Sequence, residues 1–189
     1  MATLLKDEAK YGQDKKATAE AERHFERAIA EFGKVKQRGF KLADLARPEL
    51  SELRRLTIGK AAPEIEGEDL DGQPLKLSEY RGKVIVIVFW WLRYTEASDH
   101  RKLVEHMTGK PVAFVGVCGE DDLAKGKAEV EKYGIAWPSF WDKRHGPISE
   151  NWNVHGSPDI WVLDTQGLIR YRGVRGRELK DAVETLLRE

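Results

Sequence analysis

The spacing of apolar residues divides the chain into two regions, and the first is helical. From Ala17 to Phe32, apolar residues recur every three or four positions, which places them on one face of an amphipathic helix. Gly33 follows as a stop signal. A second helical stretch spans Lys41–Leu56, with Pro48 near the start of its longer part. The apolar face of the first helix consists of Ala21, Phe25, Ala28, Ile29 and Phe32.

Beyond the turn-rich segment Thr57–Glu64, the pattern changes to alternating strands and helices. The run KVIVIVFWW, Lys83–Trp91, is uninterrupted and rich in β-branched and aromatic residues, as expected for a strand buried on both faces. The other predicted elements are short strands around an Asp71-Gly72 turn, a helix at about 96–107, a strand at 111–118, a helix within 121–133, a short segment at 137–141, a hairpin of 159–164 with 168–173, and a last helix that buries Leu179, Ala182, Val183 and Leu186.

This order of elements predicts an α/β fold with a mixed central sheet, preceded by an N-terminal helical extension. We place the extension at residues 1–56 and the α/β domain at residues 57–189. A length of 189 residues suits one well-cored domain with an appendage.

Composition narrows the classes of partner and site. Lysine plus arginine and aspartate plus glutamate each number 32, so no net charge directs the chain to nucleic acid or to an acidic membrane surface. The amino terminus lacks the pattern of a secretion signal, so we expect a cytoplasmic location for the chain as written, and an extracytoplasmic one if an export signal preceded it. The single cysteine, Cys118, excludes an intramolecular disulfide and a multi-cysteine zinc site. Oligomeric state stays open.

Several separate segments resemble a known family. They are APEIEGEDLDGQPLKLSEYRGKVIVIVFW, FVGVCGEDD and GSPDIWVLDTQGLIRYRG, and they include the Leu-Ser-x-Tyr-Arg-Gly-Lys sequence before the central strand. Together they resemble the redoxin branch of the thioredoxin superfamily, related to AhpC/TSA proteins, and in particular the TlpA-like thiol-disulfide oxidoreductases. The resemblance implies a thioredoxin-like α/β/α sandwich for residues 57–189.

The catalytic motif of that family is missing from this chain. The resemblance implies a Cys-x-x-Cys motif shortly after Phe89-Trp90, and its two cysteine positions fall on Tyr94 and Ala97. Neither a phenol nor a methyl group exchanges with a disulfide, so this interpretation predicts a degenerate active site. In a second register, like the Thr-x-x-Cys of peroxiredoxins, Thr95 leads to Ser98 at the cysteine position. A serine hydroxyl does not react with peroxide as a thiolate does.

A binding function needs no thiol. The resemblance implies that Pro158 is the cis-proline beside which backbone groups hold an extended substrate segment. We therefore predict a non-catalytic binding or scaffold module for a protein or peptide partner, with no cofactor. The alternative is that Pro158 is present only because the turn folds around it. The predicted binding groove consists of Trp91, Tyr94, Thr95, Ser98, His155, Ser157 and Pro158.

Cys118 supports an alternative function from a different class. It ends a predicted strand at the same sheet edge as the missing motif. In the alternative hypothesis, the chain is a redox enzyme or sensor that uses this thiol, either alone or with a thiol from a partner. A free cysteine is otherwise a small buried hydrophobe. Substituting Cys118 by serine separates these hypotheses, because it abolishes a redox function and leaves a binding function intact. Catalysis supplied by a thioredoxin-like partner differs from the binding hypothesis only in the identity of the partner.

Aromatic and histidine residues offer two further candidate sites. His100 and His106 are separated by about 120° on a helix, so they do not converge on one ion, and no metal site is predicted. The aromatic residues either line a peptide-binding face or fill the core. We expect Trp91 and Tyr94 to be exposed, because they follow the strand end. The aromatic set is Trp90, Trp91, Tyr94, Trp137, Trp141 and Trp152.

Overall fold

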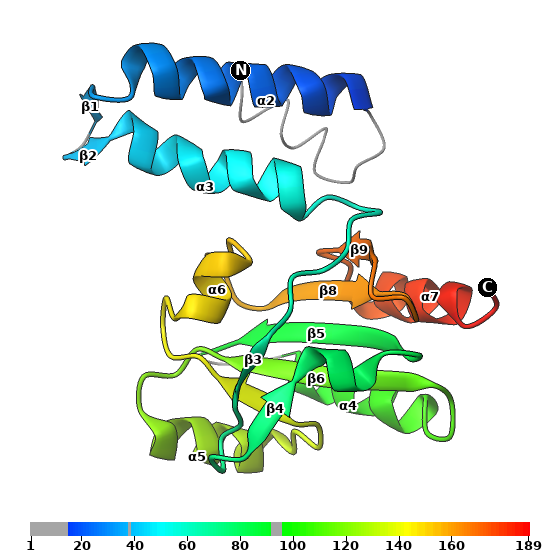
Figure 1. Cartoon of the computed structure of the whole chain (residues 1–189). Helices are drawn as coiled ribbons and strands as arrows, with labels where there is room; N and C mark the ends of the chain where they lie inside the picture. The colour runs from blue at the N-terminus through cyan, green and yellow to red at the C-terminus, as the bar shows by residue number, and fades with distance from the viewer. Residues whose placement is uncertain (1–14, 38, 92–95) are drawn as a thin grey trace. The chain divides into compact units, whose positions relative to one another are not determined.

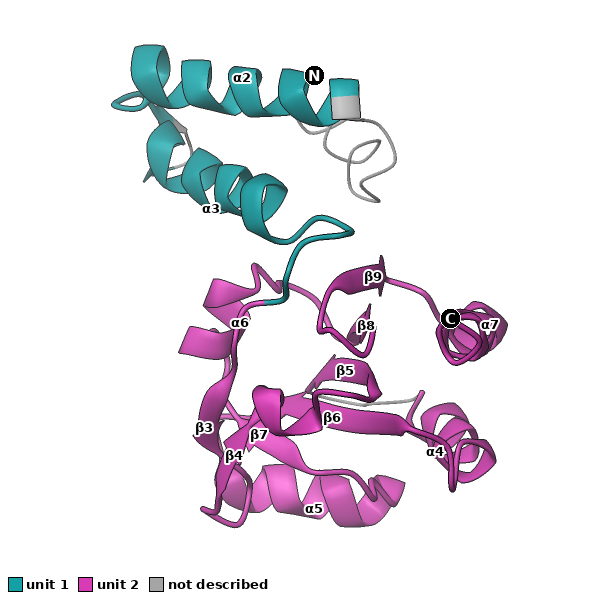
Figure 2. Ribbon diagram, turned by 45° about the vertical axis from the view of Figure 1, so that its right-hand side comes forward, with its two compact units in different colours: residues 1–62 teal, residues 63–189 magenta. Residues whose placement is uncertain are grey.

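The computed structural model describes residues 15–37, 39–91 and 96–189. The chain forms two compact units, residues 1–62 and 63–189, which are coloured separately in Figure 2. The boundary predicted from the sequence lies between residues 56 and 57. We describe each unit by itself.

The first unit is a helical hairpin of α2 (Lys15–Phe32) and α3 (Leu42–Arg55), joined through a two-stranded ribbon of β1 (Lys36–Gln37) and β2 (Phe40–Lys41) (Figure 1). Helix α3 is continuous through Pro48. Of the residues that the sequence places on the apolar face of α2, Ala21 and Phe25 are buried, whereas Phe32, the last residue of the helix, is 48% exposed. The core cluster of the hairpin consists of Ala17, Ala21, Phe25, Ala46, Leu50 and Leu53.

The second unit contains a five-stranded mixed sheet in the order β7-β6-β5-β8-β9. Strands β5, β6 and β7 are parallel, whereas β8 and β9 are antiparallel to their neighbours. The mixed α/β fold predicted from the sequence is confirmed. The strands are β5 (Val84–Trp90), β6 (Val112–Cys118), β7 (Ser139–Trp141), β8 (Asp159–Leu163) and β9 (Ile169–Arg172), and a separate hairpin pairs β3 (Glu66–Glu68) with β4 (Pro74–Lys76).

Helices bury both faces of the central strand. All seven residues of β5 are buried, as its uninterrupted apolar run predicts. Alternate residues of β5 share one core with α4 and α7, while Phe89 on the other face packs against Trp152, with ring centroids 5.8 Å apart. The helices of this unit are η1 (Leu77–Tyr80), α4 (Ala97–His106), α5 (Leu123–Tyr133), α6 (Pro147–Asn151) and α7 (Gly176–Leu186).

Most of the tryptophans belong to the core. Trp90, Trp137 and Trp152 are buried, so the hypothesis that they line a binding face is wrong for these three. Their large apolar rings fill the space between the sheet and its helices. Burying these rings stabilises the fold, because it removes a large apolar surface from water. Trp91 and Trp141 are half-buried. Tyr94 lies outside the described residues.

Over the described ranges, we find no helix with both the length and the apolar character needed to cross a membrane.

Candidate functional site

The carboxyl ends of the parallel strands β5 and β6 meet at one sheet edge. Trp90 pairs in register with Cys118, and the backbone N–H of Gly119 donates to the Trp90 carbonyl at 2.9 Å. Trp91 directly follows β5, and its indole packs so closely on Gly119 that a Cβ there would lie 2.9 Å from the ring. This is the edge at which α/β sheets generally bind ligands.

Ser157 ties the loop before β8 to the end of β5. Its Oγ accepts a hydrogen bond from the Trp91 N–H at 3.0 Å and donates one to the Trp91 carbonyl at 3.1 Å. The Ser157–Pro158 peptide bond is cis. Two hydrogen bonds from one hydroxyl therefore fix Trp91, Ser157 and Pro158 next to each other.

Arg175 connects the same loop to two helices. One guanidinium nitrogen, Nη2, donates to the Pro158 carbonyl at 2.8 Å, and the other, Nη1, donates to Glu96 Oε1 at 2.9 Å. Glu96 precedes α4, and Arg175 precedes α7. Arg175 and Glu96 are not among the site residues predicted from the sequence, because no local pattern relates two residues that lie 79 positions apart in the chain.

The other predicted site residues differ in how far they are exposed and whether the structure describes them. Tyr94 and Thr95 lie outside the described residues. Ala97 is buried in the first turn of α4, while Ser98 beside it is exposed. The exposed His155 places its Nε2 2.8 Å from the Asn153 side-chain oxygen.

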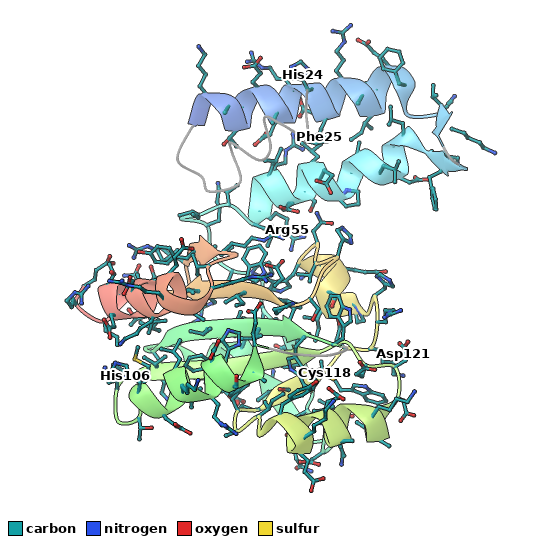
Figure 3. All side chains as sticks on the ribbon, turned by 180° about the vertical axis from the view of Figure 1, so that it is seen from behind. His24, Phe25, Arg55, His106, Cys118 and Asp121 are labelled. Carbon is teal, nitrogen blue, oxygen red and sulfur yellow. The ribbon has the colours of Figure 1, made fainter. Side chains whose placement is uncertain are left out.

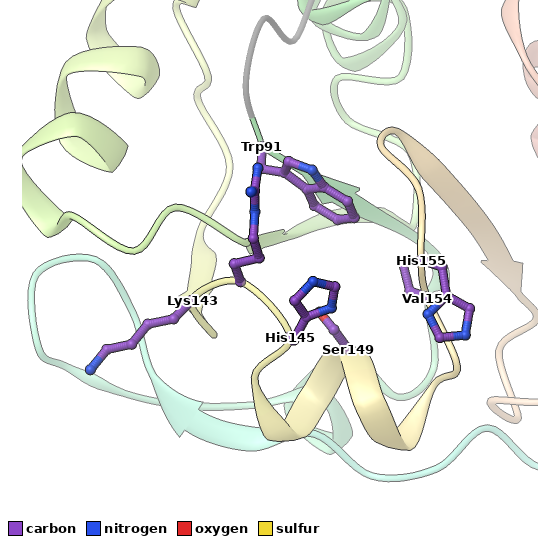
Figure 4. A pocket seen from close by; sticks show the side chains of 7 residues that line it. Trp91, Lys143, His145, Ser149, Val154 and His155 are labelled. Atoms are coloured by element: carbon purple, nitrogen blue, oxygen red, sulfur yellow. The ribbon is translucent and has the colours of Figure 1, made fainter. Parts of the chain in front are cut away.

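Trp91 and His155 border a pocket of about 210 Å³ at this edge (Figure 4). Its other walls come from the segment that joins β7 to α6, from α6 itself and from the residues that follow α6, and none of these other lining residues belongs to the predicted groove. The lining is completed by Lys143, Arg144, His145, Ser149 and Val154. Of the predicted groove, the pocket thus brings together Trp91 and His155, and it does not include Ser98.

Cys118 lies inside the core of the second unit, at the end of β6 (Figure 3). Its side chain is fully buried, and a Cβ placed on Gly126 of α5 would lie 3.2 Å from its sulfur. Burial raises the pKa of the thiol to about 12, because the thiolate loses its hydration, and the charge of Glu120 adds to the effect. A thiol with this pKa carries almost no thiolate near neutral pH, and the thiolate is the reactive form.

Native Cys118 is expected to resist alkylation. At pH 8, iodoacetamide should modify it at least about 100-fold more slowly than it modifies a free cysteine, because so little thiolate is present. Mass spectrometry of the native chain over a series of times, with the urea-unfolded chain as the control, measures both rates. Equal rates in the native and unfolded chains would contradict the burial of the thiol.

His100 is a second buried titratable group near the site. It is 2% exposed, and its Nε2 lies 4.0 Å from a carboxylate oxygen of Glu96. Burial is the main cause that lowers the pKa of His100 to about 4; the negative charge of Asp99 opposes this shift, and the positive charge of Arg175 contributes to it. The imidazole is therefore neutral at physiological pH.

The lowered pKa of His100 predicts an acid-sensitive fold. An unfolded histidine takes up a proton near pH 6.5, whereas the folded chain does so only near pH 4. The stabilisation is complete above pH 6.5 and is lost as the pH falls toward 4, by up to ~3 kcal/mol. Urea unfolding of wild type and His100→Gln at several pH values tests this. The variant should lose that part of the pH dependence, and the exposed His106→Gln should retain it.

No three histidine, cysteine, aspartate or glutamate side chains of the described ranges lie close enough together to hold a metal ion. His106 instead pairs with Glu184, at 3.1 Å between Nε2 and Oε1.

Residues 58–172 match the model of the AhpC/TSA family. The chain is 24% identical over 143 residues to thiol-disulfide oxidoreductase ResA of Bacillus cereus, covering 74% of this chain and 82% of ResA. It is 29% identical over 140 residues to peroxiredoxin Bcp of Bacillus subtilis, covering 71% and 84%. The C-terminal domain of a putative thiol-disulfide oxidoreductase from Bacteroides thetaiotaomicron has the same fold, with a TM-score of 0.64, 20% identity, and coverage of 69% of this chain and 96% of that domain.

Proposed function

Because the chain belongs to the AhpC/TSA family, in the redoxin branch of the thioredoxin superfamily, we propose that it keeps the binding edge of the fold and has lost the thiol chemistry. In this proposal the positions of the family's two cysteines are occupied by Tyr94 and Ala97. The protein is a non-catalytic binding or scaffold module, and its partner is an extended segment of another protein.

One observation carries the loss of catalysis: the chain's single thiol is a core residue. Cys118 is fully buried, and its pKa is raised to about 12, so it lacks both access to a substrate and the thiolate form. Thiol-disulfide exchange and peroxide reduction both begin with attack by a thiolate. The same burial argues against the alternative function, in which Cys118 is the redox centre.

Hydrogen bonds that fix the backbone beside Pro158 support the binding role. The hydroxyl of Ser157 is hydrogen-bonded to both backbone groups of Trp91, and Arg175 is bonded to the carbonyl of Pro158. These contacts fix the backbone beside Pro158 before any partner arrives. A pre-organised backbone loses less entropy on binding, which favours the addition of an extended segment through main-chain hydrogen bonds.

A titration with an extended, uncharged peptide tests the binding role. Acetyl-Thr-Val-Gln-Val-Thr-amide is added to the ¹⁵N-labelled full chain, and the amide signals of Trp91 and Ser157 are followed by NMR. We expect these signals to shift as the peptide binds. Substituting Ser157→Ala should weaken binding about tenfold, because two hydrogen bonds that hold the edge are lost.

The exposed Ser78→Ala, in the same unit, is the matched control and should bind like wild type. Unchanged Trp91 and Ser157 signals at millimolar peptide would contradict the proposal. Cys118→Ala should also bind like wild type. Peroxide consumption that depends on Cys118 would instead establish the alternative redox function.

A further inference from the structure

The backbone around the pocket beside Trp91 is unusual. Among the described residues, three non-glycine residues have left-handed backbone angles: Lys143 (φ 61°), His145 (φ 55°) and Asn153 (φ 49°). All three lie in or next to the two segments that form the pocket wall, around Arg144 and around His155. Such angles cost free energy in L residues and persist only where the surroundings enforce them. The fold therefore holds these two segments in an unfavourable conformation at this one place.

Two aspartates and one glycine hold the turn around Arg144 in this conformation. Buried Asp142 accepts the N–H of Ile148 on Oδ1 at 2.8 Å and the N–H of Ser149 on Oδ2 at 2.7 Å. Asp121 accepts the N–H of Arg144 at 2.9 Å. A Cβ on Gly146 would lie 1.6 Å from the Asp142 carbonyl oxygen, so only glycine fits there. The turn that carries Arg144 and His145 is thus fixed from both sides.

The pocket wall carries positive and hydrogen-bonding groups and no carboxylate side chain. Within the described ranges, the side chains of Arg144 and His145 have no ion-pair partner, whereas many other arginines of the chain are paired. The Lys143 amine does not contribute, because it lies 4.6 Å from the centroid of the Trp141 ring and points away from the pocket (Figure 4). The same view shows His145 and Trp91 facing each other across the space.

We propose that this pocket, hereafter the Arg144 pocket, receives the carboxylate of an acidic residue on the segment that docks beside Pro158. This inference rests on the proposed function. Arginine is suited to the task, because its planar guanidinium pairs with both carboxylate oxygens. A volume of about 210 Å³ has room for one acidic side chain. Trp91 joins the two sites, since its backbone bonds Ser157 and its indole lines the pocket.

Two peptides that differ at one residue test the Arg144 pocket. The full chain is titrated with acetyl-Thr-Val-Glu-Val-Thr-amide and with its glutamine counterpart, and the dissociation constants are compared by NMR. We expect the glutamate peptide to bind about tenfold more tightly, because its carboxylate forms charge-assisted hydrogen bonds with Arg144 that the neutral glutamine amide cannot form. Arg144→Gln should remove this difference. Arg177→Gln, an exposed arginine of the same unit outside the pocket, should preserve it.

The outcomes separate the two proposals. Equal affinity for both peptides overturns the carboxylate pocket and leaves the proposed binding function intact. If neither peptide binds while free glutarate shifts the Trp91 indole signal in wild type and not in Arg144→Gln, the pocket takes a free acid and the docking of a segment is wrong. If neither peptide nor glutarate binds, both proposals fail. The NMR spectrum of Arg144→Gln shows in the same experiment whether this exposed substitution leaves the fold unchanged.

Discussion

The double variant Tyr94→Cys with Ala97→Cys is expected to reduce insulin disulfides catalytically, whereas the wild-type chain is expected to be inactive. Ala97 lies in the first turn of α4, where the helix dipole and backbone N–H groups lower the pKa of nearby thiols. The first thiol attacks the disulfide, and the second then releases the mixed disulfide within the same molecule. Since that second step is intramolecular, we expect a rate on the order of 10²-fold above wild type. Insulin turbidity in the presence of dithiothreitol measures it.

Spacing provides the control for this gain of activity. Tyr94→Cys with Ser98→Cys introduces the same two thiols one residue further apart, and Ser98 is exposed on α4 whereas Ala97 is buried. This variant and Tyr94→Cys alone should remain near the wild-type rate. A folded Tyr94→Cys/Ala97→Cys variant without activity would show that the vacant cysteine positions have been assigned to the wrong residues.

Asp142→Ala is expected to destabilise the second unit by ~4 kcal/mol. The buried carboxylate accepts the N–H groups of Ile148 and Ser149, both in the first turn of α6. Hydrogen bonds to a charged group contribute ~1.5–3 kcal/mol each, and the substitution leaves both donors without their acceptor. Because α6 has only five residues, it gains little stability from its own backbone bonds. Urea unfolding followed by tryptophan fluorescence measures the change.

Asp142→Asn keeps the shape of the side chain and one acceptor oxygen, so it should lose about half as much stability. Glu150→Ala, an exposed acidic residue of the same helix, should change the free energy of unfolding by less than ~0.5 kcal/mol. If Asp142→Ala also changed the free energy of unfolding by less than ~0.5 kcal/mol, the two hydrogen bonds would not be what holds the turn. Other contacts would then have to fix the turn that carries Arg144.

Elements with a strong local pattern could be predicted from the sequence. The apolar run of β5 predicted a strand buried on both faces, and the stripe of Leu179, Val183 and Leu186 predicted the buried face of α7. The helix predicted within residues 121–133 is α5, and Asp122 caps it by accepting the N–H groups of Ala124 and Lys125. In each case the signal lies within a few residues of the element.

Elements without a repeating pattern were missed. Helix α6 is too short to show a helical period, and it depends on Asp142, which precedes it. Phe32 has the correct spacing for the apolar face of α2, but it lies at the last residue of the helix and is exposed. Periodicity identifies the face of a helix on which a residue lies. It does not show whether another element covers that part of the face.

The sequence by itself determined the fold class and the presence of one cysteine, and its resemblance to the family predicted that the two cysteine positions of the family's motif fall on Tyr94 and Ala97. Only the tertiary structure decided the state of Cys118 and the make-up of the site. The pKa of Cys118 depends on the packing of α5 and neighbouring strands against its sulfur. The contacts of Arg175 with Glu96 and Pro158, and the pocket of Trp91 with Arg144, join residues far apart in the chain. Local patterns come from the period of one helix or strand, whereas burial and charge environment arise where separate elements pack together.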